Sequence, residues 1–326
     1  MGKNDLAMLA PADPVSLDVV LNFSRPLTVG EAVATNWPRR EYILGPLQAG
    51  DVGLISGADG VGKSWVALAA GLSVGYGISA CGMFDVPTGR SGRAIYFAVE
   101  DRRADHGRRL AAIVRHIKKS EQIDGDDDTL TLVPMEGRRL PLVLPNPSRS
   151  DARGPYIVAE AGEAWAKYVE DYRLVIIDPL RAFHDMQESD GAAMDFLVRW
   201  LVSVAMRNQQ AILLVHHASQ NAILESRSDH HAGRGATDLP AGCRGVWTIR
   251  VAKFGEVPGV QDEGRRRWRV LVNAKASHAA EGATRYLAQS DDGVLVAADP
   301  PPNLDADKAN KPNKPTKGES KYGNWG

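Results

Sequence analysis

The fold is decided by one eight-residue stretch, Gly57-Ala58-Asp59-Gly60-Val61-Gly62-Lys63-Ser64. An apolar run at 52–56 precedes it and a helical pattern at 63–75 follows it, which is the strand–loop–helix context of a phosphate-binding loop. The glycines at 57 and 62 permit backbone conformations that a Cβ would exclude, so successive N–H groups can converge on phosphate oxygens at the start of a helix. We expect Lys63 to reach the β- and γ-phosphates and the Ser64 hydroxyl to bind Mg²⁺.

Nucleotide binding is predicted for this loop and for the residue that follows it. The residues are Gly57, Asp59, Gly60, Val61, Gly62, Lys63, Ser64 and Trp65. The expected cofactors are ATP and Mg²⁺. A glycine-rich turn that binds no ligand is the alternative, and the flanking strand and helix argue against it.

Short apolar runs alternate with longer helical patterns between residues 52 and 215. Strands are expected at 52–56, 94–99, 131–133, 174–177 and 211–215, and helices at 63–75, 104–118, 156–171 and 192–207. Most of the strands are continuous apolar runs, which is typical of strands buried on both faces of a parallel sheet. Further strands at 246–252, 268–272 and 294–297 have no helices between them. The sequence therefore predicts an α/β fold, with helices on both faces of a mostly parallel sheet and an antiparallel C-terminal extension.

The composition divides the chain into three regions. Residues 1–40 are interrupted by prolines and predict an N-terminal arm, with a short helix around 16–22. Residues 41–298 predict one folded core. Residues 299–326 are rich in Pro, Lys, Asn and Gly and poor in branched aliphatic residues. We expect a disordered tail there, because such a segment cannot bury enough apolar surface to fold.

Charge and cysteine content narrow the class of protein. The 326 residues include 39 Lys and Arg and 40 Asp and Glu, for a net charge of −1. This balance excludes a basic coat over the whole surface but not a local basic channel. Two cysteines exclude a disulfide scaffold and a cysteine zinc cluster. We find no signal peptide and no apolar stretch of about 18 residues, which predicts a cytoplasmic protein without a membrane partner.

Two of the predicted strands end in acidic residues. Asp178 follows the run at 174–177, where a phosphate-binding fold places the second carboxylate that organises Mg²⁺. Glu100 and Asp101 follow the run at 94–99. If that strand lies next to the strand before the phosphate-binding loop, Glu100 faces the γ-phosphate and can orient and deprotonate the attacking water. Asp101 is an alternative for this role, and a solvated acid at a strand end is the simpler alternative for both.

His216 and His217 follow the run at 211–215. Neighbouring side chains of a strand point to opposite faces, so we expect only one of them to enter the site. Their spacing from other histidines and cysteines does not suit a metal site. A histidine beside bound ATP would instead donate a hydrogen bond to the γ-phosphate and sense its presence.

These segments together resemble the RecA-like hexameric replicative helicases, and most closely the RepA-type helicases of broad-host-range plasmids, which are AAA family ATPases. The matching segments, in order, are GADGVGKS at 57–64, YFAVED at 96–101, LVIIDPLRAFH at 174–184, LLVHHAS at 213–219, GRG at 233–235, NAKAS at 273–277 and DDGV at 291–294. The resemblance covers residues 43–297. It implies a RecA-like P-loop core, ATP hydrolysis and assembly of the chain into a ring.

The resemblance also implies roles for individual residues. Glu100 is similar in position to the catalytic base, Asp178 to the Walker B aspartate and His217 to the γ-phosphate sensor. By the same resemblance, Lys63 and Ser64 are the phosphate and Mg²⁺ residues, and Asp178 joins Ser64 at the metal.

Three basic residues complete the implied machinery. Arg244 follows Arg234 by ten residues, which is the spacing that the family uses for its arginine finger. Such a finger reaches into the ATP site of the neighbouring subunit and stabilises charge in the transition state. Lys275 resembles a second cation that acts in trans, and Arg234 belongs with the residues expected to act in trans or on DNA.

The segment 218–237 is polar and directly follows His217, so we expect a mobile loop that contacts single-stranded DNA. Residues 225–285 carry eleven Lys and Arg against seven Asp and Glu. A ring would sum this local basic excess around one channel. The run Arg265-Arg266-Arg267-Trp268-Arg269 is able to contact phosphates and stack a base, although a solvated hairpin end is the favoured interpretation.

The sequence thus predicts an ATP-dependent DNA helicase of plasmid or mobile-element replication. It would act as a homo-hexamer on single-stranded DNA, with a replication initiator or a primase as a further partner. A RecA-like ATPase that binds DNA without unwinding it, as a regulator or assembly factor, needs the same motor residues and stays an alternative. A P-loop small-molecule kinase is the third, but it would need a lid and an acceptor pocket instead of an arginine acting in trans.

Overall fold

The computed structural model describes residues 27–87, 91–120, 123, 128–148, 154–217, 238–260, 262–277 and 283–301. The predicted helix around 16–22, the segment 218–237 with Arg234, and residues 302–326 of the predicted tail lie outside these described residues. No helix in the described part of the chain is long and apolar enough to cross a membrane.

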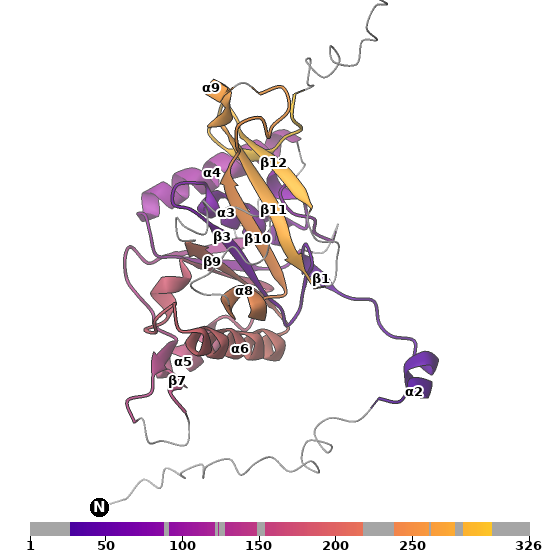
Figure 1. Cartoon of the computed structure of the whole chain (residues 1–326), viewed down its shortest axis with the longest axis vertical. Coiled ribbons are helices and arrows are strands. Elements are labelled where there is room, and N and C mark those ends of the chain that lie inside the picture. The colour runs from indigo at the N-terminus through magenta and orange to yellow at the C-terminus, as the bar shows by residue number, and fades with distance from the viewer. Residues whose placement is uncertain are drawn as a thin grey trace, which may run out of the picture.

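A nine-stranded sheet forms the centre of the molecule (Figure 1). Its strands are β3 (Val52–Gly57), β4 (Ala94–Ala98), β5 (Leu130–Pro134), β8 (Leu174–Asp178), β9 (Ala211–His217), β10 (Gly245–Val251), β11 (Trp268–Ala276), β12 (Thr284–Gln289) and β13 (Leu295–Ala297). They lie in the order β13-β12-β11-β10-β3-β9-β8-β4-β5. Neighbours from β10 to β5 pair in parallel, and neighbours from β10 to β13 pair antiparallel. The structure confirms the predicted α/β fold with its antiparallel C-terminal extension.

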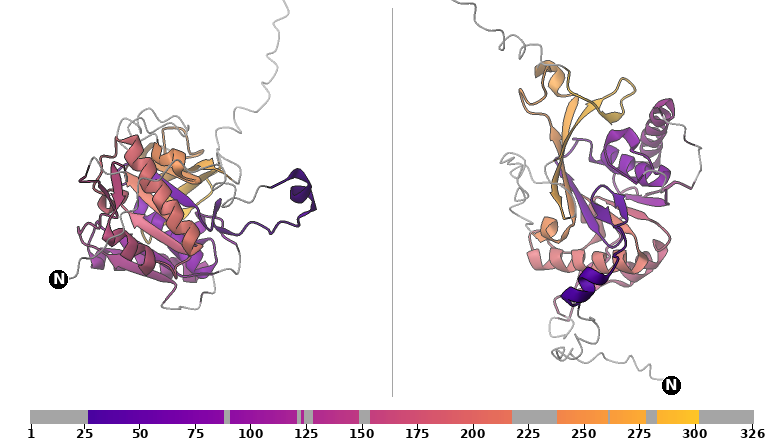
Figure 2. Two further views of the ribbon diagram at one scale, coloured as in Figure 1. Left: turned by 90° about the horizontal axis from the view of Figure 1, so that it is seen from below. Right: turned by 90° about the vertical axis from the view of Figure 1, so that its right-hand side faces the viewer.

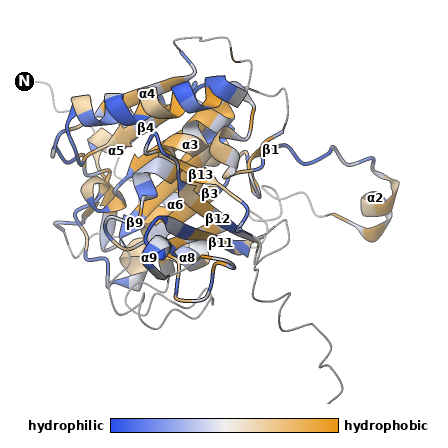
Figure 3. Ribbon diagram, turned by 90° about the horizontal axis from the view of Figure 1, so that it is seen from above, coloured by the Kyte–Doolittle hydropathy of each residue, from blue (hydrophilic) through white to orange (hydrophobic). Residues whose placement is uncertain are grey.

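Helices cover both faces of the sheet, because successive side chains of a buried strand point to opposite sides. One face carries α3 (Lys63–Tyr76) and α4 (Arg103–Ser120), and the other carries α5 (Glu160–Tyr168) and α6 (Gly191–Asn208) (Figure 2). In β4, for example, Tyr96 belongs to the apolar core under α3 and α4, and Phe97 to the core under α5 and α6. Colouring by hydropathy shows the apolar strands at the centre and hydrophilic residues along α4 (Figure 3).

Shorter elements connect and flank these layers. They are α2 (Val29–Ala34), β1 (Tyr42–Leu44), β2 (Leu47–Gln48), η1 (Ala80–Gly82), β6 (Val143–Pro145), β7 (Tyr156–Val158), η2 (Leu180–Phe183), α8 (Asp238–Gly242) and α9 (Asp262–Arg265). Helix α2 stands away from the sheet, and its Val29 and Val33 side chains are exposed (Figure 1 and Figure 2).

These shorter elements were not expected from the sequence, and two further differences concern the predicted helix at 156–171 and the main sheet. The expected helix at 156–171 is shorter, because residues 156–158 pair as β7 with β6 and the helix α5 begins only at Glu160. Tyr, Ile and Val at these three positions favour a strand when a partner strand is available. Strand β12 was not expected, because only Leu287 of it is buried and its apolar residues are interrupted by polar ones.

Candidate nucleotide-binding site

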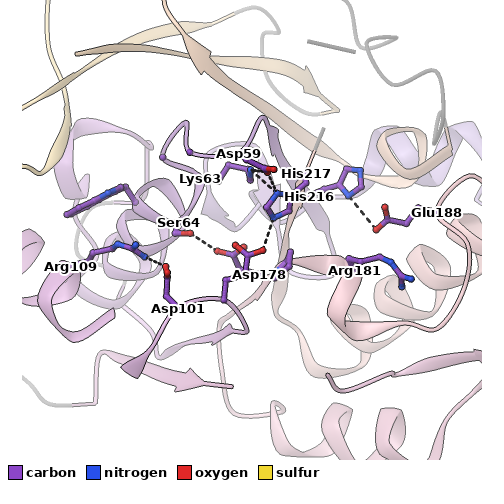
Figure 4. Close-up of a pocket in the computed structure, with 15 residues that line it drawn as sticks. Asp59, Lys63, Ser64, Asp101, Arg109, Asp178, Arg181, Glu188, His216 and His217 are labelled. Carbon is purple, nitrogen blue, oxygen red and sulfur yellow. Dashed lines mark hydrogen bonds and ion pairs between the residues drawn. The ribbon is translucent and has the colours of Figure 1, made fainter. Parts of the chain in front are cut away.

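A cavity of about 690 Å³ lies at the carboxyl ends of the parallel strands (Figure 4). Its lining residues are Asp59, Gly60, Gly62, Lys63, Ser64, Trp65, Glu100, Asp101, Arg109, Asp178, Pro179, Arg181, Glu188, His216 and His217. This edge of a parallel α/β sheet is where ligands bind. The structure therefore brings together most of the nucleotide-binding residues predicted from the sequence, and of that set Gly57 and Val61 do not line the cavity.

The glycines of the loop between β3 and α3 are needed for two different physical reasons. Gly60 and Gly62 have φ angles of +72° and +105°, in the left-handed region that favours glycine. Gly57 has no such angle. A Cβ at Gly57 would lie 2.4 Å from the carbonyl oxygen of Ile249 on β10. The expectation from the sequence was right for Gly62, but at Gly57 the requirement is close packing between neighbouring strands.

Lys63 begins α3 and is 6% exposed. Its Nζ donates to the carbonyl oxygens of Gly57 at 3.0 Å and Ala58 at 2.7 Å, so the side chain folds back over its own loop. The same Nζ lies 3.4 Å from Nδ1 of His217. Burial lowers the pKa of Lys63, and nearby carboxylates oppose that shift. The loop thus holds one buried ammonium group at the floor of the cavity.

Asp178 ends β8 and receives two hydrogen bonds. The Ser64 hydroxyl donates to Asp178 Oδ2 at 3.1 Å, and the hydroxyl of Tyr96 donates to the same oxygen. Burial raises the pKa of Asp178, and both donors counteract this. Tyr96 was not singled out from the sequence. Its position inside an apolar strand could have indicated a role, because a buried tyrosine hydroxyl needs a hydrogen-bond partner.

His217 connects the loop to the end of β4. Its Nδ1 contacts the carboxylate of Asp59, and its Nε2 lies 3.5 Å from Oε1 of Glu100. The hydrogen bond from His217 lowers the pKa of Asp59. Lys63, Asp59 and His217 therefore contact one another beside the cavity (Figure 4). Glu100 continues this chain of polar contacts through His217.

Glu100 reaches this position although its strand does not neighbour the loop strand. Strands β9 and β8 lie between β3 and β4, so the adjacency considered from the sequence is wrong. All four strands end at one edge of the sheet, which is why their terminal side chains still meet. The two acids differ in their contacts, because Asp101 is held by Arg109 at 2.6 Å while the Glu100 side chain is 61% exposed.

His216 lines the same cavity as His217, which corrects the expectation that only one of the two would enter the site. The two rings do point to different partners. Nδ1 of His216 lies 3.9 Å from Oε1 of Glu188, and this oxygen is also 3.6 Å from Nε2 of the fully buried His184. Burial lowers the pKa of His216. Glu188 and Arg181 were not predicted, and they form the end of the cavity away from the loop (Figure 4).

The predicted trans-acting residues lie elsewhere. Arg244 is exposed and precedes β10, where its N–H donates to the carbonyl of Val52 at the start of β3. It therefore lies at the amino ends of the parallel strands, and the phosphate-binding loop lies at their carboxyl ends. Lys275 lies at the same end of β11, opposite Val246 of β10, and its Nζ donates to the carbonyls of Pro240 and Ala241 in α8. Arg234 lies outside the described residues.

The arginine-rich run at 265–269 makes contacts within the chain. Arg265 donates to the carbonyl of Ala252, and Arg267 to the carbonyl of Gln289. These contacts agree with a hairpin end. Arg269 does not fit the interpretation as a solvated hairpin end, because its Nε donates at 2.9 Å to the carbonyl of Val61 in the phosphate-binding loop.

The fold and the loop define a P-loop nucleotide-binding domain of the α/β class. The profile of an AAA domain family (AAA_25) matches residues 21–222, more than half of the chain, and the chain belongs to this family. Among solved structures it is similar to an isolated ATPase domain, with a TM-score of 0.50, 12% identity, and coverage of 78% of this chain and 86% of that chain. It is also similar to a DnaB-like replicative helicase solved for its interactions with primase, with a TM-score of 0.51, 12% identity and coverage of 76% of this chain. The chain spans 57% of the length of that helicase.

At this level of identity the solved structures establish the fold, which is RecA-like. The family match includes β3, α3, β4, β8 and β9, and so all the strands whose ends form the cavity. It stops before Arg244 and before the antiparallel extension. Membership in this family implies a nucleotide-binding domain.

Proposed function

We propose that this chain is a Mg²⁺-dependent ATPase motor that unwinds DNA, of the RepA type used in plasmid or mobile-element replication. It would act as a hexameric ring that moves along single-stranded DNA. The observation that carries the proposal is the convergence of Lys63, Ser64, Asp178, Glu100 and His217 on one cavity at the carboxyl edge of the sheet. These are the chemical groups needed to bind, polarise and hydrolyse a triphosphate.

The residues present suit a magnesium ion. The Ser64 hydroxyl and the Asp178 carboxylate are oxygen donors 3.1 Å apart, and Mg²⁺ prefers oxygen ligands. Both side chains would hold the ion, and Tyr96 would hold the carboxylate in place. When bound, Mg²⁺ would neutralise negative charge on the phosphate oxygens.

Glu100 is proposed as the general base. Its carboxylate is exposed to the cavity, whereas the competing carboxylate of Asp101 is paired with Arg109. A base must have a free lone pair within reach of the water that it deprotonates. His217 lies between Glu100 and Lys63, so it is proposed to register the γ-phosphate and to pass the change to the chain that follows β9.

Arg244 and Lys275 are proposed to act on the ATP of a neighbouring subunit. Arg244 lies at the sheet edge opposite its own phosphate-binding loop, so it cannot stabilise charge in its own site. Arg234 and the segment 218–237 are proposed to contact single-stranded DNA, since this segment continues directly from His217. A replication initiator or a primase is the proposed further partner, because one similar helicase was solved for its interactions with primase.

The proposal is tested by ATP hydrolysis with and without single-stranded DNA and by strand displacement on a forked duplex. The wild-type chain should hydrolyse ATP faster with DNA and displace the strand. Lys63→Ala should lose both activities, because it removes the buried ammonium group of the loop. Unwinding by Lys63→Ala would contradict the mechanism. Hydrolysis without displacement by the wild type would favour the DNA-binding regulator.

A further inference from the structure

Arg269 is the second residue of β11, and its side chain contacts the phosphate-binding loop. Its Nε donates to the carbonyl oxygen of Val61 at 2.9 Å, across 208 positions of sequence. A second nitrogen donates to the carbonyl oxygens of Arg266 at 2.6 Å and Trp268 at 3.1 Å. Within the described residues, the acceptors of this guanidinium are carbonyl groups and include no carboxylate. The group keeps its positive charge, since arginine does not deprotonate in proteins.

The peptide unit that Arg269 contacts joins Val61 to Gly62. In a trans peptide the C=O and the N–H lie in one plane and point in opposite directions. The carbonyl of Val61 is turned toward β11, so the N–H of Gly62 is turned away from it. Gly62 lines the cavity and Arg269 does not. This peptide therefore presents its donor to the cavity and its acceptor to Arg269.

The opposite orientation would disfavour nucleotide binding. If the peptide turned over, the carbonyl oxygen would face the phosphate oxygens, and one of the loop's donors would be lost. Gly62, with φ at +105°, lacks the Cβ that would restrict this rotation. A second contact from the antiparallel extension does not select a direction. A methyl group of Leu295 on β13 lies 3.2 Å from the point where a Cβ on Gly62 would be, and a methyl group neither donates nor accepts a hydrogen bond.

We propose that Arg269 is a positioning residue that orients the Gly62 N–H toward the phosphates of a nucleoside di- or triphosphate. The inference rests on the proposed function of the same site. It adds that the antiparallel extension, which the family profile does not include, sets the nucleotide affinity of the loop. Arg269 acts through the Val61–Gly62 peptide and does not touch the nucleotide.

Two substitutions and one matched control test this role. Arg269→Met keeps the apolar stem but removes all the donors, and Arg269→Lys keeps the charge without the geometry of Nε. Arg267→Met is the control, because Arg267 lies two residues earlier, is 59% exposed, and donates to Gln289 and Asp291 instead of the loop. Calorimetry would give the Kd for ADP, steady-state kinetics the KM and kcat for ATP, and thermal melting the stability of the apo-protein.

Arg269→Met should raise the Kd for ADP and the KM for ATP by about tenfold, the effect of losing a charge-assisted hydrogen bond. The kcat at saturating ATP should stay within about twofold, because the bound phosphate itself orients the peptide once the site is occupied. Arg269→Lys should fall between Met and wild type. Arg267→Met should leave all three constants unchanged.

An unchanged Kd for ADP in Arg269→Met would overturn the inference, whether or not the melting temperature falls. A fall in kcat with an unchanged KM would overturn it too, since that pattern belongs to a group acting in the transition state. The proposed function is judged separately by Lys63→Ala. If that variant keeps hydrolysing ATP, the proposed function fails whatever Arg269 does.

Discussion

At the scale of single residues, two adjacent acids at the end of β4 have different environments. The side chain of Glu100 is 61% exposed and its carboxylate lies 3.5 Å from His217, whereas the carboxylate of Asp101 is bound by Arg109. Asp101 also has a φ of +64°, so the backbone leaves the extended conformation of the strand at this residue. The pairing of Asp101 with Arg109 supports the proposal that Glu100, and not Asp101, acts as the general base.

Glu100→Gln should therefore lower kcat by about 10²–10⁴-fold, the usual contribution of a general base. The Kd for ADP should stay close to that of wild type, because the carboxylate does not hold the loop. Asp101→Asn should change kcat by less than about threefold, since it loses only a partly exposed ion pair. Steady-state kinetics on the two isosteric variants makes the comparison. A larger loss from Asp101→Asn would reverse the two roles.

At the scale of elements, the phosphate-binding loop lies between a helix and two strands of the sheet. Helix α3 continues from the loop on one side, and β10 and β11 lie next to it on the other. The packing is tight at Gly57, where a Cβ would lie 2.4 Å from the carbonyl oxygen of Ile249 on β10. The pairing of β3 with β10 therefore limits which residue can end β3.

Gly57→Ala should destabilise the protein by about 3 kcal/mol, because a Cβ placed 2.4 Å from a backbone carbonyl forces the two strands apart. Gly60→Ala is the matched control from the same loop. Gly60 has a φ of +72° but no atom within 4 Å of its Cβ position, so alanine there should cost only about 1 kcal/mol of backbone strain. Urea unfolding of both variants measures the difference. Equal losses would show that conformation, and not strand packing, requires the glycine at position 57.

At the scale of the whole molecule, the proposed catalytic groups lie at opposite ends of the parallel strands of one sheet. Lys63 and Glu100 line the cavity at the carboxyl edge, and Arg244 lies beside the start of β3 at the other edge. A single chain therefore cannot place Arg244 in its own cavity. An active site that uses this arginine has to form between two copies of the chain.

Lys63→Ala and Arg244→Ala should each lose ATPase activity when assayed alone. Mixed in equal amounts, they should regain part of it, because random assembly pairs an intact loop with an intact arginine at about a quarter of the interfaces. A chain carrying both substitutions, mixed with either single variant, should regain nothing. Failure of the two single variants to complement each other would contradict a site shared between subunits.

Much of the site was predictable, because its residues end apolar runs. Gly57-Ala58-Asp59-Gly60-Val61-Gly62-Lys63-Ser64, Asp178 and His217 each follow a strand that the hydrophobic pattern already indicates. In a parallel sheet such ends meet at one edge, so their proximity follows from local signals alone. The structure shows where these residues lie, whereas their catalytic roles, like those of Arg244 and Lys275, stay predictions. Arg234 lies outside the described residues.

The sequence by itself determined the strand–loop–helix at residues 52–76 and the order of the buried parallel strands along the chain. The hydrophobic pattern and the spacing of the glycines, which indicate these elements, are local properties of the sequence. Only the tertiary structure decided that β9 and β8 separate β3 from β4. It also decided three side-chain contacts: the hydrogen bond from Tyr96 to Asp178, the ion pair of Arg109 with Asp101, and the hydrogen bond from Arg269 to the carbonyl of Val61. Each of these contacts joins residues on different elements. Their partners are chosen by how the layers pack, and no pattern within a single segment carries that information.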